Sequence, residues 1–132
     1  MTDKRILVVD DEPHITHVLA LKLRGAGYTV ETAGDGEEGF EMARQTVPDL
    51  IITDLQMPYL TGLEMCQKLR SNAETAEIPA LLLTARGYGL SPEDLATTNI
   101  LEMLSKPFGP REVLEKVNAV FAGDSSAQAE AA

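Results

Sequence analysis

The feature that most constrains this fold is a series of short apolar runs, each followed by a segment with helical spacing of apolar residues. The first run is ILVV at residues 6–9, and it ends in Asp10 and Asp11. A strand that is apolar at consecutive positions is covered on both faces, as in a parallel sheet. The apolar runs indicate strands over residues 6–9, 28–32, 50–53, 80–84 and 100–104.

Helix signals occupy the segments between these strands. Pro13 suits the first turn of a helix. Asp35 precedes Glu38, and Thr61 precedes Glu64, by the three residues of a capping box. Five strand–helix units with short connections predict an α/β fold, with a doubly wound, five-stranded parallel sheet and helices on both faces. Further helices are indicated from Ser91 and through the apolar residues of 113–121.

Length and charge limit the possible functions. The 132 residues suffice for one domain, which we expect over 1–122, followed by a disordered tail at 123–132. The 21 acidic residues outnumber the 11 Lys and Arg residues, and the net charge of −10 disfavours nucleic acid and anionic membranes as partners. We therefore expect a cytoplasmic protein with no direct DNA binding, and the first apolar run is too short to cross a membrane.

Two other groups of residues carry weaker signals. Cys66 is the only cysteine and lies among apolar residues, so we interpret it as a small buried hydrophobe. His14 and His17 are three residues apart, but no further His or Cys completes a zinc site. We expect these two histidines on a solvated helix face.

The ends of the predicted strands carry the chemistry. Ligands of open parallel sheets bind outside the carboxyl ends of the strands. Here those ends bring three acids, a hydroxyl and an amine to one edge. Three close carboxylates repel one another unless a cation compensates, and ligands that are all oxygen favour Mg²⁺. The residues are Asp10, Asp11, Asp54, Thr84 and Lys106.

Such a set suits phosphoryl transfer, in which a metal ion and a lysine neutralise phosphate oxygens while an acid oxygen attacks. Asp54 is the natural acceptor, because it is central and follows a buried run. Asp11 alone fits a helix cap equally well. Asp54 does not, because Thr61 is the better cap of the next helix.

These motifs resemble the receiver domain of bacterial two-component response regulators. The matching stretches are ILVVDDEP, LIITDLQMPYLTGLE, LLLTAR and LSKPF, over about residues 4–122. Thr84 stands 30 residues after Asp54 (84 minus 54), and Lys106 stands 22 residues after Thr84 (106 minus 84). The resemblance implies a flavodoxin-like (βα)5 fold with strand order 2-1-3-4-5. It suggests the stand-alone type, since no output domain follows residue 122.

The resemblance also implies roles for single residues. Asp54 would accept a phosphoryl group from a phosphohistidine of a sensor histidine kinase or a histidine phosphotransfer protein. Lys106 would bind a phosphate oxygen, and Thr84 would turn its hydroxyl onto the phosphoryl group as a switch. Mg²⁺ would be held by Asp11, Asp54 and the backbone carbonyl of Gln56, with Asp10 acting through water.

One position departs from the family pattern. An aromatic residue usually stands three positions before the lysine, but here that residue is Met103. Met103 could take over the switch role, Tyr88 could replace it, or Met103 could be only a packing residue. These alternatives stay open at the level of the sequence.

Three functions compete. The first is a phosphorylatable switch that is an enzyme only in catalysing its own phosphotransfer and dephosphorylation, and that binds a downstream protein as a monomer or weak dimer. The second is an interaction module independent of phosphorylation, but such a module has no need of three close acids. The third is an aspartyl phosphatase, but those enzymes place a second acid two residues after the nucleophile, and here that residue is Gln56.

Overall fold

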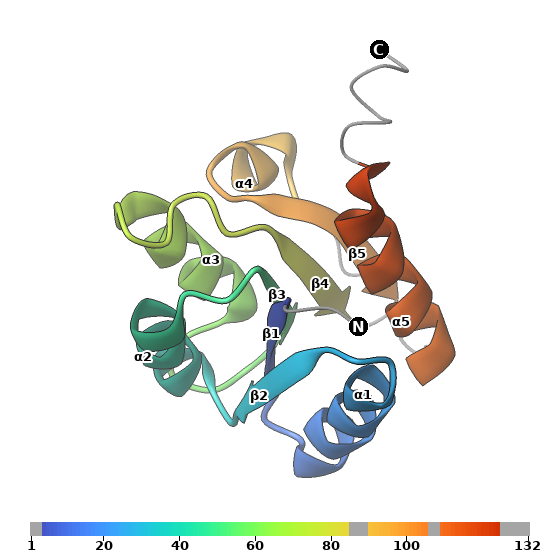
Figure 1. The fold of residues 1–132 in the computed structure, drawn as a ribbon. Coiled ribbons are helices and arrows are strands. Elements are labelled where there is room, and N and C mark those ends of the chain that lie inside the picture. Colours follow the sequence, from blue (N-terminus) through green and yellow to red (C-terminus); the bar gives the residue numbers. More distant parts are fainter. Residues whose placement is uncertain (1–3, 85–89, 106–108, 125–132) are drawn as a thin grey trace.

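The alternation of strands and helices is confirmed in the computed structural model, which describes residues 4–84, 90–105 and 109–124 (Figure 1). Every predicted strand and helix is present within these ranges. The elements are β1 (Arg5–Val9), α1 (Pro13–Gly25), β2 (Thr29–Ala33), α2 (Gly36–Thr46), β3 (Leu50–Asp54), α3 (Gly62–Ser71), β4 (Ala80–Thr84), α4 (Pro92–Ala96), β5 (Ile100–Ser105) and α5 (Pro110–Ala119).

The five strands form one parallel sheet in the order β2-β1-β3-β4-β5, as the family resemblance implied. Helices α1 and α5 cover one face, and α2 and α3 cover the other (Figure 1). Alternate residues of β1 and β3 enter the two apolar clusters that these layers enclose. The continuous apolar runs therefore reflect burial on both faces of the sheet.

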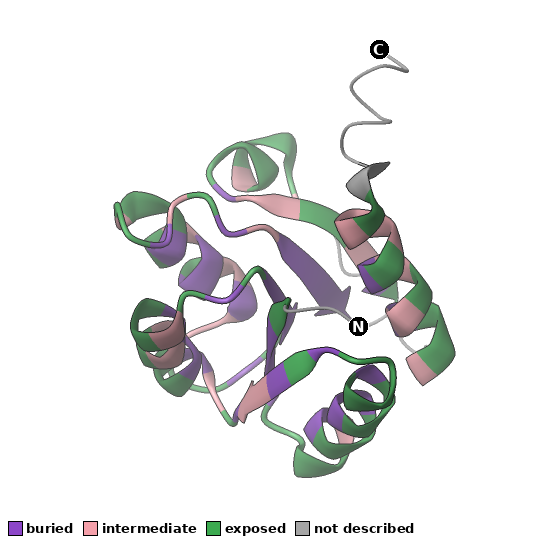
Figure 2. Cartoon of the chain, viewed as in Figure 1, coloured by how far each residue is buried: buried purple, intermediate pink, exposed green. Residues whose placement is uncertain are grey.

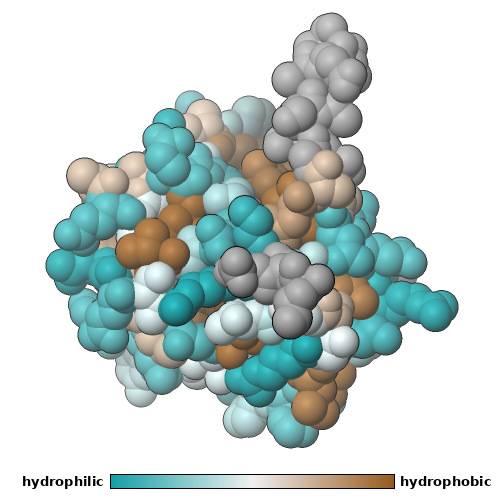
Figure 3. Space-filling view, in the orientation of Figure 1, coloured by the Kyte–Doolittle hydropathy of each residue, from teal (hydrophilic) through white to brown (hydrophobic). Residues whose placement is uncertain are grey.

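Burial is greatest in the middle of the sheet. Every residue of β3 and β4 is buried, whereas β5 buries only Leu104 (Figure 2). On the face shown in Figure 3, hydrophilic side chains dominate and hydrophobic ones form small, separate groups. Most apolar side chains are thus in the interior. Their packing holds the central strands, whose ends carry the candidate site, in place.

Two local expectations need correction. The second strand begins at Thr29 and not at Tyr28, because Tyr28 N–H donates to Leu23 O near the end of α1 (3.2 Å) and not to a neighbouring strand. Asp35 caps α2 as expected, but the Glu38 carboxylate accepts from Gly34 N–H (2.8 Å) instead of closing a capping box. The capping box of Thr61 and Glu64 at α3 is present.

The last helix is also shorter than its apolar pattern suggests. The α-helical part ends at Ala119, and Val120–Asp124 continue as one turn of π-helix. The Phe121 ring packs against Tyr28, with 5.5 Å between ring centroids. The rest of the expected tail, residues 125–132, lies outside the described residues. Among the helices described, none is long and apolar enough to cross a membrane.

Candidate functional site

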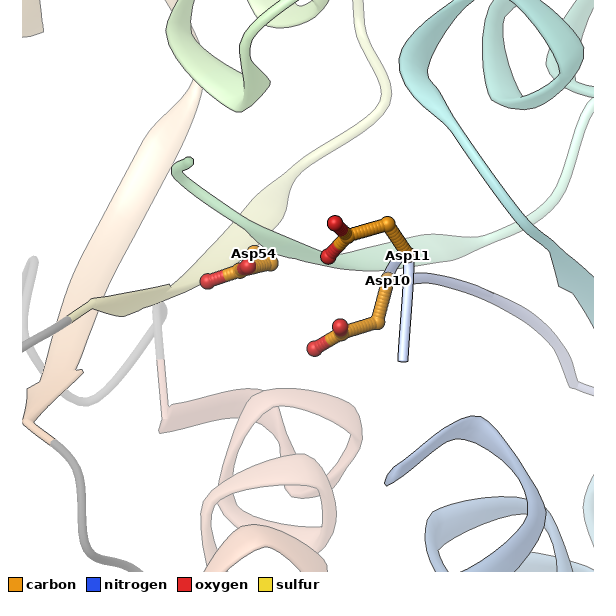
Figure 4. Close-up of side chains that lie close together, drawn as sticks. All are labelled: Asp10, Asp11 and Asp54. Atoms are coloured by element: carbon orange, nitrogen blue, oxygen red, sulfur yellow. The ribbon is translucent and has the colours of Figure 1, made fainter. Parts of the chain in front are cut away.

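Three carboxylates meet at the carboxyl edge of the sheet. Asp10 and Asp11 follow β1, and Asp54 ends β3 (Figure 4). These strands are parallel neighbours with Val9 opposite Thr53, so their ends lie side by side. One carboxylate oxygen from each aspartate lies within 4.8 Å of the others. The structure therefore brings together the three acids that the sequence predicted at one site.

The three acids differ in their exposure. Asp10 and Asp54 are buried, whereas Asp11 is exposed. Asp10 Oδ1 accepts a hydrogen bond from Glu12 N–H (2.9 Å), which turns the chain toward α1. The N-cap of α1 is Glu12, and its side chain makes no capping hydrogen bond. Asp11 is thus not the helix cap, and the capping alternative for this residue is wrong.

The backbone holds the Asp54 carboxylate in place. Leu55 N–H donates both to Asp54 Oδ1 (3.0 Å) and to Leu83 O in β4 (2.9 Å), so one proton is shared between the carboxylate and the sheet. The buried Thr53 hydroxyl donates to the Asp54 backbone carbonyl (2.9 Å). The acceptor candidate is therefore attached directly to the hydrogen-bond network of the central strands.

Two glycines fix the loop that joins β3 to α3. A Cβ on Gly62 would lie 2.1 Å from the Asp54 backbone oxygen, and a Cβ on Gly36 would lie 2.2 Å from the Leu60 backbone oxygen. Real Cβ atoms do not approach backbone so closely, so both positions require glycine. Gly62 N–H also donates to Leu55 O (2.8 Å). The start of α3 thus packs directly behind the candidate acceptor.

The remaining predicted site residues surround this centre. Thr84 is buried at the end of β4, next to β3. Gln56 is exposed, and with Asp11 it lines an open cavity of about 480 Å³ between the β3–α3 loop and the start of α4. Met103 is half-buried in β5, opposite Leu82 of β4. Lys106 and Tyr88 lie outside the described residues.

The weaker sequence signals have structural explanations. His14 and His17 are both exposed on α1, as expected of a solvated face. Cys66 is buried in the apolar cluster under α3, and burial raises the pKa of its thiol to about 12. A thiol with this pKa stays protonated at neutral pH, so Cys66 serves as a small apolar residue.

Comparison with known proteins now decides the family. The sequence model of the response regulator receiver domain family matches residues 6–118. The chain belongs to the response regulator receiver domain family. Receiver domains of two-component systems are phosphorylated by histidine kinases and generally bind Mg²⁺ at an acidic site.

Solved receiver domains share the fold. The chemotaxis response regulator CheY4 of Vibrio cholerae is 33% identical with a TM-score of 0.81, and the match covers 90% of this chain and 99% of that one. The receiver domain of the sensor histidine kinase PA1611 from Pseudomonas aeruginosa is 26% identical with a TM-score of 0.77, over 89% of this chain and 96% of that one. That structure has a magnesium ion coordinated in its active site cleft.

Curated relatives are longer than this receiver domain. The DNA-binding dual master transcriptional regulator RpaA of Synechocystis is 40% identical over 89% of this chain and 48% of its own length. The regulator PhoP of Bacillus subtilis is 40% identical over 90% of this chain and 49% of its own length. The chain spans about half the length of these relatives. The stand-alone type and the absence of direct DNA binding therefore remain predictions.

Two features of the receiver site leave no signal in the residue pattern. Tyr59, in the loop after Asp54, has a positive φ of 70°, which an aromatic residue rarely adopts. Leu55 bonds Asp54 and Leu83 through its backbone N–H, which no residue pattern marks. Gly62 could have been suspected, because a glycine directly after the capping Thr61 suggests close packing, but its contact with Asp54 could not.

Proposed function

We propose that this receiver domain is a phosphorylatable switch in which Asp54 accepts a phosphoryl group from a phosphohistidine of a sensor histidine kinase or a histidine phosphotransfer protein. A carboxylate oxygen of Asp54 forms the new P–O bond while the P–N bond to the imidazole breaks. The imidazole nitrogen keeps the bonding pair and takes up a proton. The observation that carries this proposal is the group of three carboxylates around the end of buried β3.

The donor set suits Mg²⁺. The gathered side chains offer only carboxylate oxygens, and among them Asp11 is exposed beside the open cavity. Hard oxygen ligands and an open side, where waters and a phosphate can complete the coordination, are what Mg²⁺ requires. Asp11, Asp54 and the backbone carbonyl of Gln56 would hold the ion, and Asp10 would act through water. When bound, Mg²⁺ would supply positive charge beside the phosphoryl oxygens.

The other predicted residues complete the proposal. Thr84 ends β4 and follows Leu83, the register partner of Asp54, so its hydroxyl is carried by a strand beside the acceptor. Lys106 would bind a phosphate oxygen, by resemblance to the family. Met103 pairs with Leu82 two residues before Thr84, which suits a side chain that follows the movement of Thr84. The phosphorylated state would differ from the free state in these contacts.

The output of the switch is proposed to be a change in protein binding or an onward relay of the phosphoryl group, in the cytoplasm and as a monomer or weak dimer. Its catalysis is limited to its own phosphotransfer and dephosphorylation. The high negative charge supports a protein target and not nucleic acid as the direct partner of this domain.

The experiment is to incubate the protein with acetyl phosphate, with and without Mg²⁺, and to measure the mass of the intact chain. We expect one phosphoryl group per chain, dependent on Mg²⁺, and none on Asp54→Ala. Asp49→Ala is the matched control, because Asp49 is exposed at the opposite end of β3 and should not affect the adduct. An adduct on Asp54→Ala would disprove the acceptor assignment. No adduct on the wild type would favour the phosphorylation-independent interaction module.

A further inference from the structure

The loop between β3 and α3 contains a strained turn. Leu60 N–H donates to Pro58 O (2.7 Å), two residues back, and the residue between them, Tyr59, has φ 70°. These are the features of a γ-turn with positive φ at its centre, a rare and strained conformation. Glycine adopts such a φ at no cost, but a side chain with a Cβ does not. The chain therefore keeps a tyrosine where glycine would relieve strain.

The Tyr59 side chain makes few stabilising contacts with the described residues of the domain. It is 82% exposed, the largest exposed fraction among the large hydrophobic side chains that the structure describes. Within the described residues its ring stacks on no other aromatic ring, and its hydroxyl has no hydrogen bond. Packing and hydrogen bonding among the described residues therefore do not explain why this position holds an aromatic residue.

Val47 shows what a structural reason for a positive φ looks like. It has φ 44°, and it ends α2 with its N–H donating to Ala43 O (2.9 Å). The left-handed conformation there serves the helix end. Val47 precedes β3, at the edge of the sheet opposite the carboxylates. It therefore gives a matched case of strain and exposure away from the site.

Tyr59 belongs to the loop that borders the candidate site. Its neighbour Pro58 lines the open cavity of about 480 Å³, together with Gln56 and the acids Asp11 and Asp94. The candidate acceptor Asp54 is only 6% exposed, so a donor protein must bring its phosphohistidine close to the carboxyl edge of the sheet. The loop is held at both ends by the close contacts of Gly36 and Gly62, so it presents the ring with little loss of freedom on binding.

We propose that Tyr59 is a specificity-determining contact for the protein that donates the phosphoryl group to Asp54. The ring packs on apolar side chains beside the donor's phosphohistidine, and basic side chains of the donor face Asp94. Tyrosine suits this role, because it offers a large, rigid contact area with few rotatable bonds. This inference rests on the proposed function, because it needs Asp54 to be the acceptor.

The test compares two phosphodonors on four proteins: the wild type, Tyr59→Gly, Tyr59→Phe and Val47→Gly. One donor is acetyl phosphate, which carries no protein surface that could pack on the Tyr59 ring. The other is a panel of autophosphorylated histidine-kinase cytoplasmic domains from the organism that encodes the chain. The kinase that transfers fastest to the wild type is used for all variants, and denaturant unfolding is measured on each.

We expect Tyr59→Gly to resist denaturant at least as well as the wild type and to keep its rate with acetyl phosphate within about twofold. Its kcat/KM for transfer from the kinase should fall about tenfold. Tyr59→Phe keeps the ring and should transfer like the wild type. Val47→Gly relieves strain at the opposite edge and should leave both donors within about twofold.

Two results would overturn the inference while leaving the proposed function in place. One is normal transfer from the kinase to Tyr59→Gly. The other is an equal loss with both donors, because that would make Tyr59 a support of the acceptor and not a contact of the donor. A wild type that takes no phosphoryl group from acetyl phosphate or from any kinase would overturn the proposed function itself, and the inference with it.

Discussion

Strands β4 and β5 are neighbours in one sheet, but they differ sharply in how firmly they are held. All five residues of β4 are buried, whereas β5 is half-buried or exposed at every position except Leu104 (Figure 2). The register between them shifts after the pair Ala80–Ile100, so that Leu101 is an extra residue and is 51% exposed. Such a bulge locally disrupts the ladder and bends the strand.

The helices that precede these two strands, α3 before β4 and α4 before β5, show the same contrast. Helix α3 begins with a capping box and buries Met65, Cys66 and Leu69 among its residues. Helix α4 has only the residues Pro92–Ala96 and buries none of them. The candidate acceptor thus belongs to the firmly packed centre of the sheet, and Met103 belongs to its weakly packed edge. A structure divided in this way can hold its chemistry still while its edge changes conformation.

The largest expected effect tests packing directly. Leu82→Ala in β4 removes a fully buried side chain and should lower the free energy of unfolding by about 3 kcal/mol. Leu101→Ala in the bulge of β5 should lower it by less than about 0.5 kcal/mol. Urea unfolding of both variants measures the difference. Similar losses would show that the edge is packed as firmly as the centre.

The next effect concerns the contact between α3 and the acceptor. Gly62→Ala places a Cβ against the Asp54 backbone oxygen and should cost about 1–3 kcal/mol of stability, as overpacking does. It should also slow phosphorylation by acetyl phosphate, because the Asp54 backbone must move. Gly25→Ala is the control, since a Cβ there meets nothing within 4 Å. If the acetyl phosphate rate of folded Gly62→Ala matches that of the wild type, the acceptor does not depend on this contact.

A smaller effect separates the two capping boxes. Thr61→Ala should lower the global free energy of unfolding by about 1 kcal/mol, because α3 is part of the core. Ser91→Ala removes the equivalent cap from α4, but we expect it to speed amide hydrogen exchange in α4 with little global loss. Equal global losses would show that α4 unfolds together with the rest of the domain.

The smallest effect concerns position 103. Met103→Tyr should change the amide spectrum of the protein saturated with beryllofluoride, a mimic of the phosphoryl group, more than the spectrum of the free protein. The reason is that a switch residue differs in its contacts between the two states. Equal spectral changes in both states would make Met103 a packing residue of β5 only.

Burial explains how much of this structure could be predicted. The apolar runs placed β4 at its observed bounds and β3 within one residue, because strands covered on both faces leave an unbroken pattern in the sequence. The edge strands were predicted nearly as well, with β5 within one residue and β2 shifted by one. Tyr28 is apolar enough to suggest a strand residue, but its N–H bonds Leu23 O near the end of α1, and the extra residue Leu101 leaves no mark in the sequence.

The candidate site likewise has parts that could be predicted from the sequence and parts that could not. Asp10, Asp11 and Asp54 could be placed together, because parallel strands bring their carboxyl ends to one edge. The γ-turn at Tyr59 could not be predicted, because it sets an aromatic residue in a conformation that residue type disfavours. Backbone groups such as Leu55 N–H are common to all residues, so their roles emerge only from the folded chain.

The shared proton of Leu55 has a consequence for how the domain could sense its own chemistry. An ionised carboxylate oxygen is a stronger hydrogen-bond acceptor than the oxygen of an acyl phosphate. Phosphorylation of Asp54 would therefore weaken the hydrogen bond from Leu55 N–H to its carboxyl oxygen. The proton then bonds more fully to Leu83 O, one residue before Thr84. The backbone hydrogen bond between β3 and β4 would thus change its strength with the charge on Asp54, before any side chain moves.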